Sequence, residues 1–193
     1  MKRIGITGGI GSGKSFVANI IEKMGYPVYY SDIRSKELTN SHPIIRQGLI
    51  ELVGENVYSG GELNKKELAM AIFSNDALRL KVNQLIHPIV RQDYEDWASK
   101  QANFLVFNEA AILFETGAYR NFDATILVHA PKELRLKRVL NRDNSTEAEV
   151  ISRINGQFKD EEKLKMTPFH ILNDGEQALL SQIEGVLTTI SES

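Results

Sequence analysis

The sequence predicts an α/β fold of three layers, in which a parallel five-stranded sheet carries helices on both faces. Three observations favour this fold: short β-rich runs separated by helical patterns, a glycine-rich turn directly after the first run, and one long helical stretch without convincing strands. Strands that alternate with helices form a parallel sheet wrapped by its crossovers. A chain of 193 residues has the length of one domain with an insertion.

The five strand candidates are short β-rich or apolar runs, as buried parallel strands usually are. They are 3–7, 27–30, 104–107, 125–128 and 169–172. Helical periodicity follows the first run, where Val17, Ile20, Ile21 and Met24 share a face and Gly25 ends the pattern. Later helices are expected over about 132–142, after the start signal at 145–147, and along the final apolar stripe from 179 to 190.

The stretch from 42 to about 101 differs in character, because it contains several helical patterns and no convincing strand. A turn at 59–61 breaks it, and Asn64 and Ser74 are suitable helix caps. It is too long for a simple crossover, so we expect an inserted helical domain over about 32–101. The core would then comprise 1–31, 102–134 and 167–193, with a lid over about 135–166.

Composition excludes several classes of protein. Hydrophobic residues make up 42% of the chain and the net charge is −2, which argues against disorder and against a nucleic-acid or membrane-surface protein. No segment approaches the roughly 18 apolar residues of a membrane span. The chain has no cysteine, which fits a cytoplasmic location. The oligomeric state has no signature in the sequence.

The segment Gly8-Gly9-Ile10-Gly11-Ser12-Gly13-Lys14-Ser15 matches G-x-x-x-x-G-K-[ST], the phosphate-binding loop. It follows a strand and opens a helix, so its amides would point at phosphate oxygens near the positive end of the helix dipole. Lys14 would contact the β- and γ-phosphates of ATP, and the Ser15 hydroxyl would be a ligand for Mg²⁺. The expected nucleotide-binding residues of this loop are Gly11, Ser12, Gly13, Lys14, Ser15 and Phe16.

The loop alone does not separate kinases from other P-loop NTPases. A GTPase needs N-K-x-D after a later strand, whereas Asn64-Lys65-Lys66-Glu67 ends in Glu and lies in the helical insertion. A helix cap explains that segment better. ATPase motors have longer chains. A kinase with the three-layer P-loop NTPase fold is therefore the favoured class.

Two carboxylates follow strand candidates. Asp32 comes directly after the second one, where ligands gather in open α/β sheets, and could orient an acceptor hydroxyl and accept its proton. The alternative is that Ser31 or Asp32 only begins the next helix. Glu109, after the third strand candidate, could support Mg²⁺ through water or be an ordinary strand-end acid.

A basic stripe suggests a lid over phosphates. Arg135, Arg138 and Arg142 are spaced for one helix face, turned away from the apolar face, and Arg153 and Gln157 share a face of the next helix. Arginines stabilise transferring charge in phosphotransferases. A solvated helix face is the alternative.

The histidines give no metal cluster. His42 and His87 precede proline, which usually marks a helix start, and His129 and His170 lie on strand candidates. Any metal is expected to be Mg²⁺ brought by ATP.

The chain resembles the dephospho-CoA kinase family nearly from end to end. The segments that carry the resemblance are 4–15, Ser31-Asp32, Leu85-Ile86-His87-Pro88-Ile89, Leu113-Phe114-Glu115, Arg138, Arg142-Asp143, Arg153, Gln157 and Asn173-Asp174-Gly175. The resemblance implies ATP and dephospho-CoA as substrates and phosphorylation of the ribose 3′-hydroxyl, the last step of coenzyme A synthesis. It also implies that Asp32 lies at the acceptor hydroxyl with His87 nearby, that Arg138 and Arg142 belong to the ATP lid, and that the inserted helices form the coenzyme A domain.

The sequence departs from the family pattern at a few positions, and none of them removes an expected catalytic part. They are Phe16 for Thr, Tyr30 for Asp, Ala111 for Pro, Arg135 for Gln, and Phe169-His170 for Ala-Asp. The expected catalytic residues are Asp32, Lys14 and Arg142. Two rival hypotheses stay open: another small-molecule or nucleotide kinase on the same scaffold, and an ATP-binding module without turnover.

Overall fold

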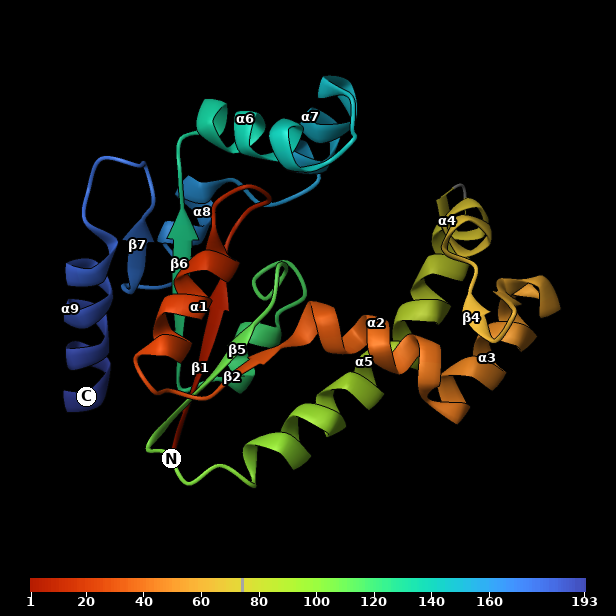
Figure 1. Ribbon diagram of the computed structural model, residues 1–193, viewed down its shortest axis with the longest axis horizontal. Coiled ribbons are helices and arrows are strands. Elements are labelled where there is room, and N and C mark those ends of the chain that lie inside the picture. The colour runs from red at the N-terminus through yellow and green to blue at the C-terminus, as the bar shows by residue number, and fades with distance from the viewer. Residues whose placement is uncertain (74) are drawn as a thin grey trace. The chain divides into compact units, whose positions relative to one another are not determined.

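The computed structural model describes residues 1–73 and 75–193 (Figure 1). The chain divides into two compact units, of which the first combines Met1–Tyr30 with Gln101–Ser193 and the second is Ser31–Lys100. Within the described residues, no helix combines the length and the apolar composition that a bilayer span requires. The expected cap Ser74 lies outside the described residues.

A five-stranded parallel sheet forms the centre of the first unit, which confirms the predicted fold class. The strand order is β2-β5-β1-β6-β7. These strands are β1 (Lys2–Thr7), β2 (Val28–Tyr30), β5 (Leu105–Glu109), β6 (Ala124–His129) and β7 (His170–Leu172). All five strand candidates of the sequence are therefore present, with ends shifted by one or two residues.

Both faces of the sheet are covered. Ile4 and Ile6 point to one face and pack with α1 (Lys14–Lys23) and α9 (Leu179–Glu192) in the main core. Gly5 points to the opposite face, since successive strand residues alternate. A Cβ atom on Gly5 would lie 2.8 Å from Leu113 and 3.2 Å from Phe122, so the segment after β5 packs closely there. This segment includes η2 (Ala118–Asn121).

The register brings three strand ends together at one edge of the sheet. Ile6 of β1 pairs with Glu109 of β5, and Glu109 also pairs with Tyr30 at the end of β2. The phosphate loop begins at Gly8, directly after the end of β1 at Thr7. The loop and Glu109 are therefore neighbours at the carboxyl edge, where α/β proteins bind ligands.

The region between β6 and β7 contains α6 (Lys132–Arg142), α7 (Glu147–Asn155) and α8 (Asp160–Leu164). Thr146 caps α7 in a capping box with Glu149, as the predicted start signal requires. The two longer helices pack on each other through a small apolar cluster around Val139, Val150 and Ile154. The short helix α8 contacts β6.

The second unit has a core of its own, which includes Leu38, Leu49, Val82 and Ile86. Its elements are α2 (Ser31–Ser41), α3 (Pro43–Val53), η1 (Glu55–Val57), β3 (Tyr58–Ser59), β4 (Glu62–Leu63), α4 (Lys65–Phe73) and α5 (Asp76–Ala98). Asn64 caps α4 by accepting a hydrogen bond from the Glu67 amide at 3.2 Å, as predicted. Asn75 caps α5 through the Leu78 amide.

Two expectations about the second unit are wrong. The sequence predicts no strand in this stretch, but β3 and β4 pair as a small antiparallel hairpin around the expected turn, and they are too short to show a strand pattern in the sequence. His87-Pro88 does not start a helix, because Pro88 lies inside α5. A proline there removes one helical hydrogen bond, and the packing of the long helix compensates for it. His42 does precede a helix start, at Pro43 of α3.

Candidate active site

The phosphate loop connects β1 to α1, which is the context that its sequence predicted. Gly11 and Gly13 have φ angles of 78° and 89°, in the left-handed region that favours glycine. A Cβ atom on Gly13 would also overlap the Asn173 side chain, so the loop is tightly packed at this point. The helix α1 begins at Lys14. The first amides of this helix, and with them the positive end of its dipole, point toward the phosphate loop.

Ser12 lies in the middle of the loop and is fully buried. Its amide donates to the Gly9 carbonyl at 3.0 Å, and its own carbonyl accepts from Asn173 Nδ2 at 2.9 Å. Ser12 therefore shapes the loop in this structure. Asn173 directly follows β7, the strand at one end of the sheet. The start of the segment Asn173-Asp174-Gly175 therefore holds the phosphate loop from the β7 side.

Glu109 lies beside the N-terminus of α1, the helix that follows the phosphate loop. It is almost completely buried, with 3% of its side chain exposed. Its Oε1 accepts a hydrogen bond from Ser15 Oγ at 3.1 Å and lies 2.8 Å from Lys14 Nζ. Buried carboxylates are paired as a rule, and both partners of Glu109 are side chains at the end of the phosphate loop. The geometry therefore favours a place for Glu109 in the site.

Asp32 lies in the first turn of α2, two residues beyond the end of β2. The helix begins at Ser31, so Asp32 is a first-turn residue. A negative charge at this position stabilises the helix through its interaction with the helix dipole. It belongs to the second unit, and its predicted role at the acceptor hydroxyl stays a prediction. His87 lies on α5 of the same unit, where burial of the ring, and then the charge of Arg91, lower its pKa.

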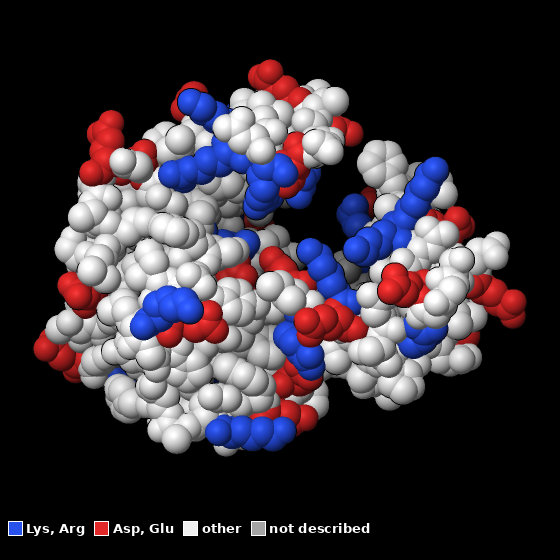
Figure 2. Space-filling model, in the orientation of Figure 1, with Lys and Arg blue, Asp and Glu red and all other residues white. Residues whose placement is uncertain are grey.

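The three arginines of α6 do not share one exposed face, which corrects the expected stripe. Figure 2 shows basic side chains gathered where α6 lies, but Arg135 is buried, with only 5% of its surface exposed. The reason is that the first half of α6 packs directly on the phosphate loop. Arg138 instead donates to the Asn173 carbonyl at 3.0 Å and to its Oδ1 at 3.3 Å.

Arg142 extends from the last turn of α6 and is 64% exposed. It donates two hydrogen bonds to the neighbouring carboxylate of Asp143, at 2.8 and 3.1 Å. Asp143 also lies 3.5 Å from Arg153 of α7. The hydrogen bond with Arg142 lowers the pKa of Asp143, and the same bond raises the pKa of Arg142. Arg142 thus stays charged in its pair with Asp143.

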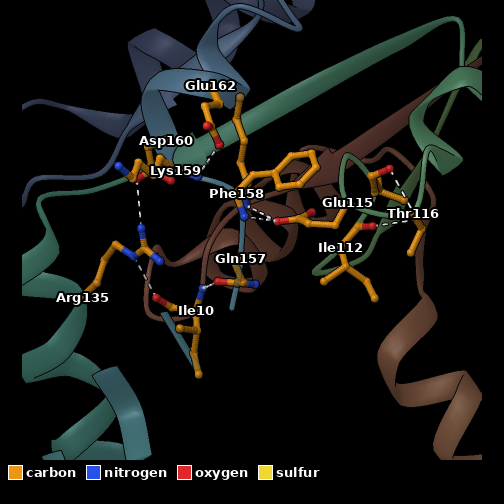
Figure 3. Close-up of polar contacts among 12 residues, drawn as sticks. Ile10, Ile112, Glu115, Thr116, Arg135, Gln157, Phe158, Lys159, Asp160 and Glu162 are labelled. Atoms are coloured by element: carbon orange, nitrogen blue, oxygen red, sulfur yellow. Dashed lines mark hydrogen bonds and ion pairs between the residues drawn. The ribbon is translucent and has the colours of Figure 1, made fainter. Parts of the chain in front are cut away.

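The helix α8 and the connection that leads to it from α7 carry contacts that the sequence did not predict (Figure 3). Lys163 is fully buried and lies 2.8 Å from Glu115 Oε1, which also accepts from the Phe158 amide at 3.2 Å. Asp160 pairs with Arg135 at 3.0 Å. The charged run 159–163 resembles a solvated surface segment, so no local signal could have indicated that two of its members are tied to the site.

A cavity of about 690 Å³ lies beside these residues in the first unit. Its lining comes from the ends of β6 and β7, the start of α6 and the α7–α8 connection, and includes His129, Arg135, Gln157, Asp160 and Leu172. Burial and the neighbouring His170 lower the pKa of His129, against the opposing effect of Asp160 and Asp174. Its surroundings therefore favour the neutral form of His129.

The phosphate loop lies at the N-terminus of α1, where Lys14 and Ser15 contact the buried Glu109. The helix α6 carries arginines and packs beside this loop. These features are those of the P-loop kinases. A family model described as dephospho-CoA kinase matches residues 2–178 of the chain. A dephospho-CoA kinase of Bacteroides fragilis is 46% identical over 182 residues, which cover 94% of this chain and 89% of the relative.

Two solved structures share the fold over nearly their whole length. The protein TT1252 from Thermus thermophilus has a TM-score of 0.86 at 34% identity, with 99% of this chain and 96% of that chain covered. A dephospho-CoA kinase from Campylobacter jejuni has a TM-score of 0.69 at 24% identity, with 98% and 96% covered.

The chain belongs to the dephospho-CoA kinase family. This confirms the resemblance seen in the sequence and the predicted class of enzyme, a kinase that transfers phosphoryl groups and takes ATP as a substrate.

Proposed function

We propose that this protein transfers the γ-phosphate of ATP to the ribose 3′-hydroxyl of dephospho-CoA and so produces coenzyme A and ADP in the last step of coenzyme A synthesis. The observation that carries the proposal is the pairing of Lys14 and Ser15 with the buried Glu109 at the head of the phosphate loop, in a chain that belongs to this family.

The donor nucleotide binds at the loop. The amides from Gly11 to Phe16 and the Lys14 ammonium would hold the β- and γ-phosphates, because backbone donors and a flexible cation at a helix N-terminus complement a polyanion. Among these amides, those of Ser12 and Phe16 donate to the Gly9 and Gly13 carbonyls in this structure and would have to turn to the nucleotide when it binds. Arg138 and Arg142 on α6 contact the nucleotide from the lid. Arg142 exchanges its carboxylate partner Asp143 for phosphate oxygens, since its side chain already lies exposed in solvent.

The site also fits Mg²⁺. Its donors at the loop are the Ser15 hydroxyl and the Glu109 carboxylate, 3.1 Å apart, and both are oxygen ligands of the kind that Mg²⁺ prefers. Within the described residues, no group of three or more His, Cys, Asp or Glu side chains forms a protein cage for a metal. Mg²⁺ in nucleotide sites takes most of its ligands from water and phosphate. Ser15 would bind the ion directly and Glu109 through water, and the ion would neutralise charge on the phosphates.

The second unit supplies the acceptor side of the reaction. Asp32 orients the ribose hydroxyl and accepts its proton late in the transfer, which is the role of a carboxylate in kinases that act on alcohols. His87 contributes to acceptor binding as a neutral side chain, since its pKa is lowered by burial and by Arg91. The loop and the lid would orient the γ-phosphate for in-line attack, and closure of the lid would exclude water from the transfer.

A coupled ADP-release assay tests the proposal. ADP should form only when dephospho-CoA and Mg²⁺ are both present, and mass spectrometry should show that dephospho-CoA gains one phosphoryl group per ADP. Release of ADP with other alcohols or nucleotides but not with dephospho-CoA would identify another small-molecule kinase. ATP binding without ADP formation with any acceptor would identify a binding module.

We expect the partners of the protein to be these small molecules, with no nucleic acid and no membrane among them. The cytoplasmic location remains a prediction from the sequence. Cell fractionation with a cytoplasmic marker enzyme would test it.

A further inference from the structure

The tip of the phosphate loop lies directly against Arg135 of α6 (Figure 3). Arg135 Nε donates to the Ile10 carbonyl at 2.9 Å. A Cβ atom on Gly9 would overlap the Arg135 guanidinium, and one on Gly11 would lie 2.5 Å from the Arg135 carbonyl oxygen. Three successive loop residues therefore pack on one arginine, and two of them need to be glycine for this approach.

The main-chain amide of Ile10 is held by a residue of the α7–α8 connection. The Ile10 amide donates to Gln157 Oε1 at 2.8 Å. Figure 3 shows Arg135 and Gln157 converging on Ile10 from different elements. The two elements that form the lid region thus both hold the main chain of a single loop residue.

The Arg135 side chain and the main chain next to Gln157 are each held by a further contact. Arg135 Nη1 donates to Asp160 Oδ2 at 3.0 Å, which neutralises a cation that is almost completely buried. Gln157 directly precedes Phe158, whose amide donates to Glu115 at 3.2 Å. Supporting contacts of this kind hold a side chain to a single geometry, which is what a positioning role requires.

The geometry points to a clamp on the Ile10 main chain, in which Arg135 and Gln157 act as positioning residues for the nucleotide. The inference rests on the proposed function, since it concerns how the same loop binds ATP. Neither residue needs to contact the nucleotide. Both act through Ile10, the residue that precedes the first amide assigned to the phosphates, that of Gly11.

The clamp matters because the loop binds phosphate with main-chain amides, whose directions depend on the turn that precedes them. A carbonyl oxygen turned toward the phosphates would repel them, and the hydrogen bond to Arg135 holds the Ile10 oxygen against this rotation. Preorganised donors are worth more than donors that reorganise when the ligand binds. Loss of the clamp should therefore weaken ATP binding and leave the acceptor unaffected.

The test compares Arg135→Met, Gln157→Leu and the double variant with the parent protein. Affinity for a non-hydrolysable ATP analogue is measured by calorimetry, and KM is measured separately for ATP and dephospho-CoA. Each single change should weaken analogue binding about tenfold, the scale of one well-made or charge-assisted hydrogen bond. The KM for dephospho-CoA should stay at the parent value. The double variant should lose less than the product of the single losses, because both side chains hold one residue.

Arg46→Met is the matched control, since Arg46 also binds main-chain carbonyls, those of Asn40 and Gly61 at 2.7 and 2.8 Å, but in the second unit. It should lower Tm without changing analogue affinity. If Arg135→Met does not fold, the analogue affinity of Gln157→Leu alone tests the inference. This variant should fold, because Gln157 is uncharged and only partly buried.

Three results would overturn the inference. Parent-like analogue affinity in the two single variants would show that these contacts only stabilise the fold. An equal rise in both KM values would show a general disturbance of the protein. A parent protein that binds no ATP analogue would overturn the proposed function itself, and the clamp with it.

Discussion

Lys14 Nζ lies 2.8 Å from Glu109 Oε1, the same oxygen that accepts the Ser15 hydroxyl. The lysine side chain is 18% exposed and that of the glutamate 3%, so the pair is largely shielded from water. In this arrangement the cation that the phosphates require is held beside the loop by a carboxylate. Binding of ATP with Mg²⁺ would exchange these partners, with Lys14 turning to phosphate and Glu109 to the hydrated metal.

Replacing Lys14 by Ala should reduce both activity and stability. Losing one preorganised electrostatic group at the transferring phosphate typically costs about 3–4 kcal/mol of transition-state stabilisation, or a factor of several hundred in kcat. Breaking a buried ion pair by removing one partner costs up to about 3–5 kcal/mol, and the partial exposure of Lys14 reduces that figure. Steady-state kinetics and chemical denaturation measure the two effects.

The double variant Lys14→Ala with Glu109→Gln separates them. Neutralising the orphaned carboxylate should restore part of the free energy of unfolding, because no uncompensated charge remains buried. Activity should stay low, since the phosphate cation is still missing. Recovery of turnover in the double variant would show that Lys14 serves only to balance Glu109.

Asp32→Asn tests the acceptor carboxylate against its role in the first turn of α2. If Asp32 handles the hydroxyl proton, kcat should fall about 100-fold or more, the scale of a positioned acid or base, while ATP affinity stays near that of the parent. The loss of a first-turn charge costs only about 0.3–1 kcal/mol of stability. An active Asp32→Asn enzyme would assign the residue to helix formation and leave the hydroxyl without its expected base.

Arg142→Ala should lower kcat and also weaken ATP binding, because the lid contacts the donor phosphates. Lys137→Ala is the control, since Lys137 lies exposed on the same helix and has no proposed role. Removing Arg142 costs little stability, because water screens an exposed ion pair such as that with Asp143. Equal ATP affinities in the two variants would place Arg142 outside the nucleotide site.

Stability should depend on the protonation of His129. Burial and His170 lower its pKa in the folded protein, so the unfolded chain binds the proton more readily. The stabilisation is complete above the unfolded pKa of about 6.5 and is lost as the pH falls from there through the folded value. His129→Leu should flatten the decrease in unfolding free energy between pH 7 and pH 5, measured by denaturation at each pH. Parallel curves for the two proteins would contradict this.

The sequence by itself determined the sheet, the phosphate loop and most helices, because these features have local signals. Apolar runs indicated all five strands, and the capping residues Asn64 and Thr146 marked helix starts that the structure confirms. The loop motif indicated where a polyanion binds, since its glycines, lysine and serine are consecutive. Periodicity failed where local patterns mislead: the hairpin at 58–63 is too short to show alternation, and Pro88 lies within a helix that its packing maintains.

Only the tertiary structure decided which side chains meet. Glu109 is 94 residues from Ser15, Arg135 is 125 residues from Ile10, and Gln157 is 147 residues from Ile10. Such contacts depend on strand order and helix packing, which no local pattern encodes. The spacing of Arg135, Arg138 and Arg142 therefore indicated one face of a helix. Only the packing of that helix on the phosphate loop shows that the first of these arginines is buried against it while the last stays in solvent.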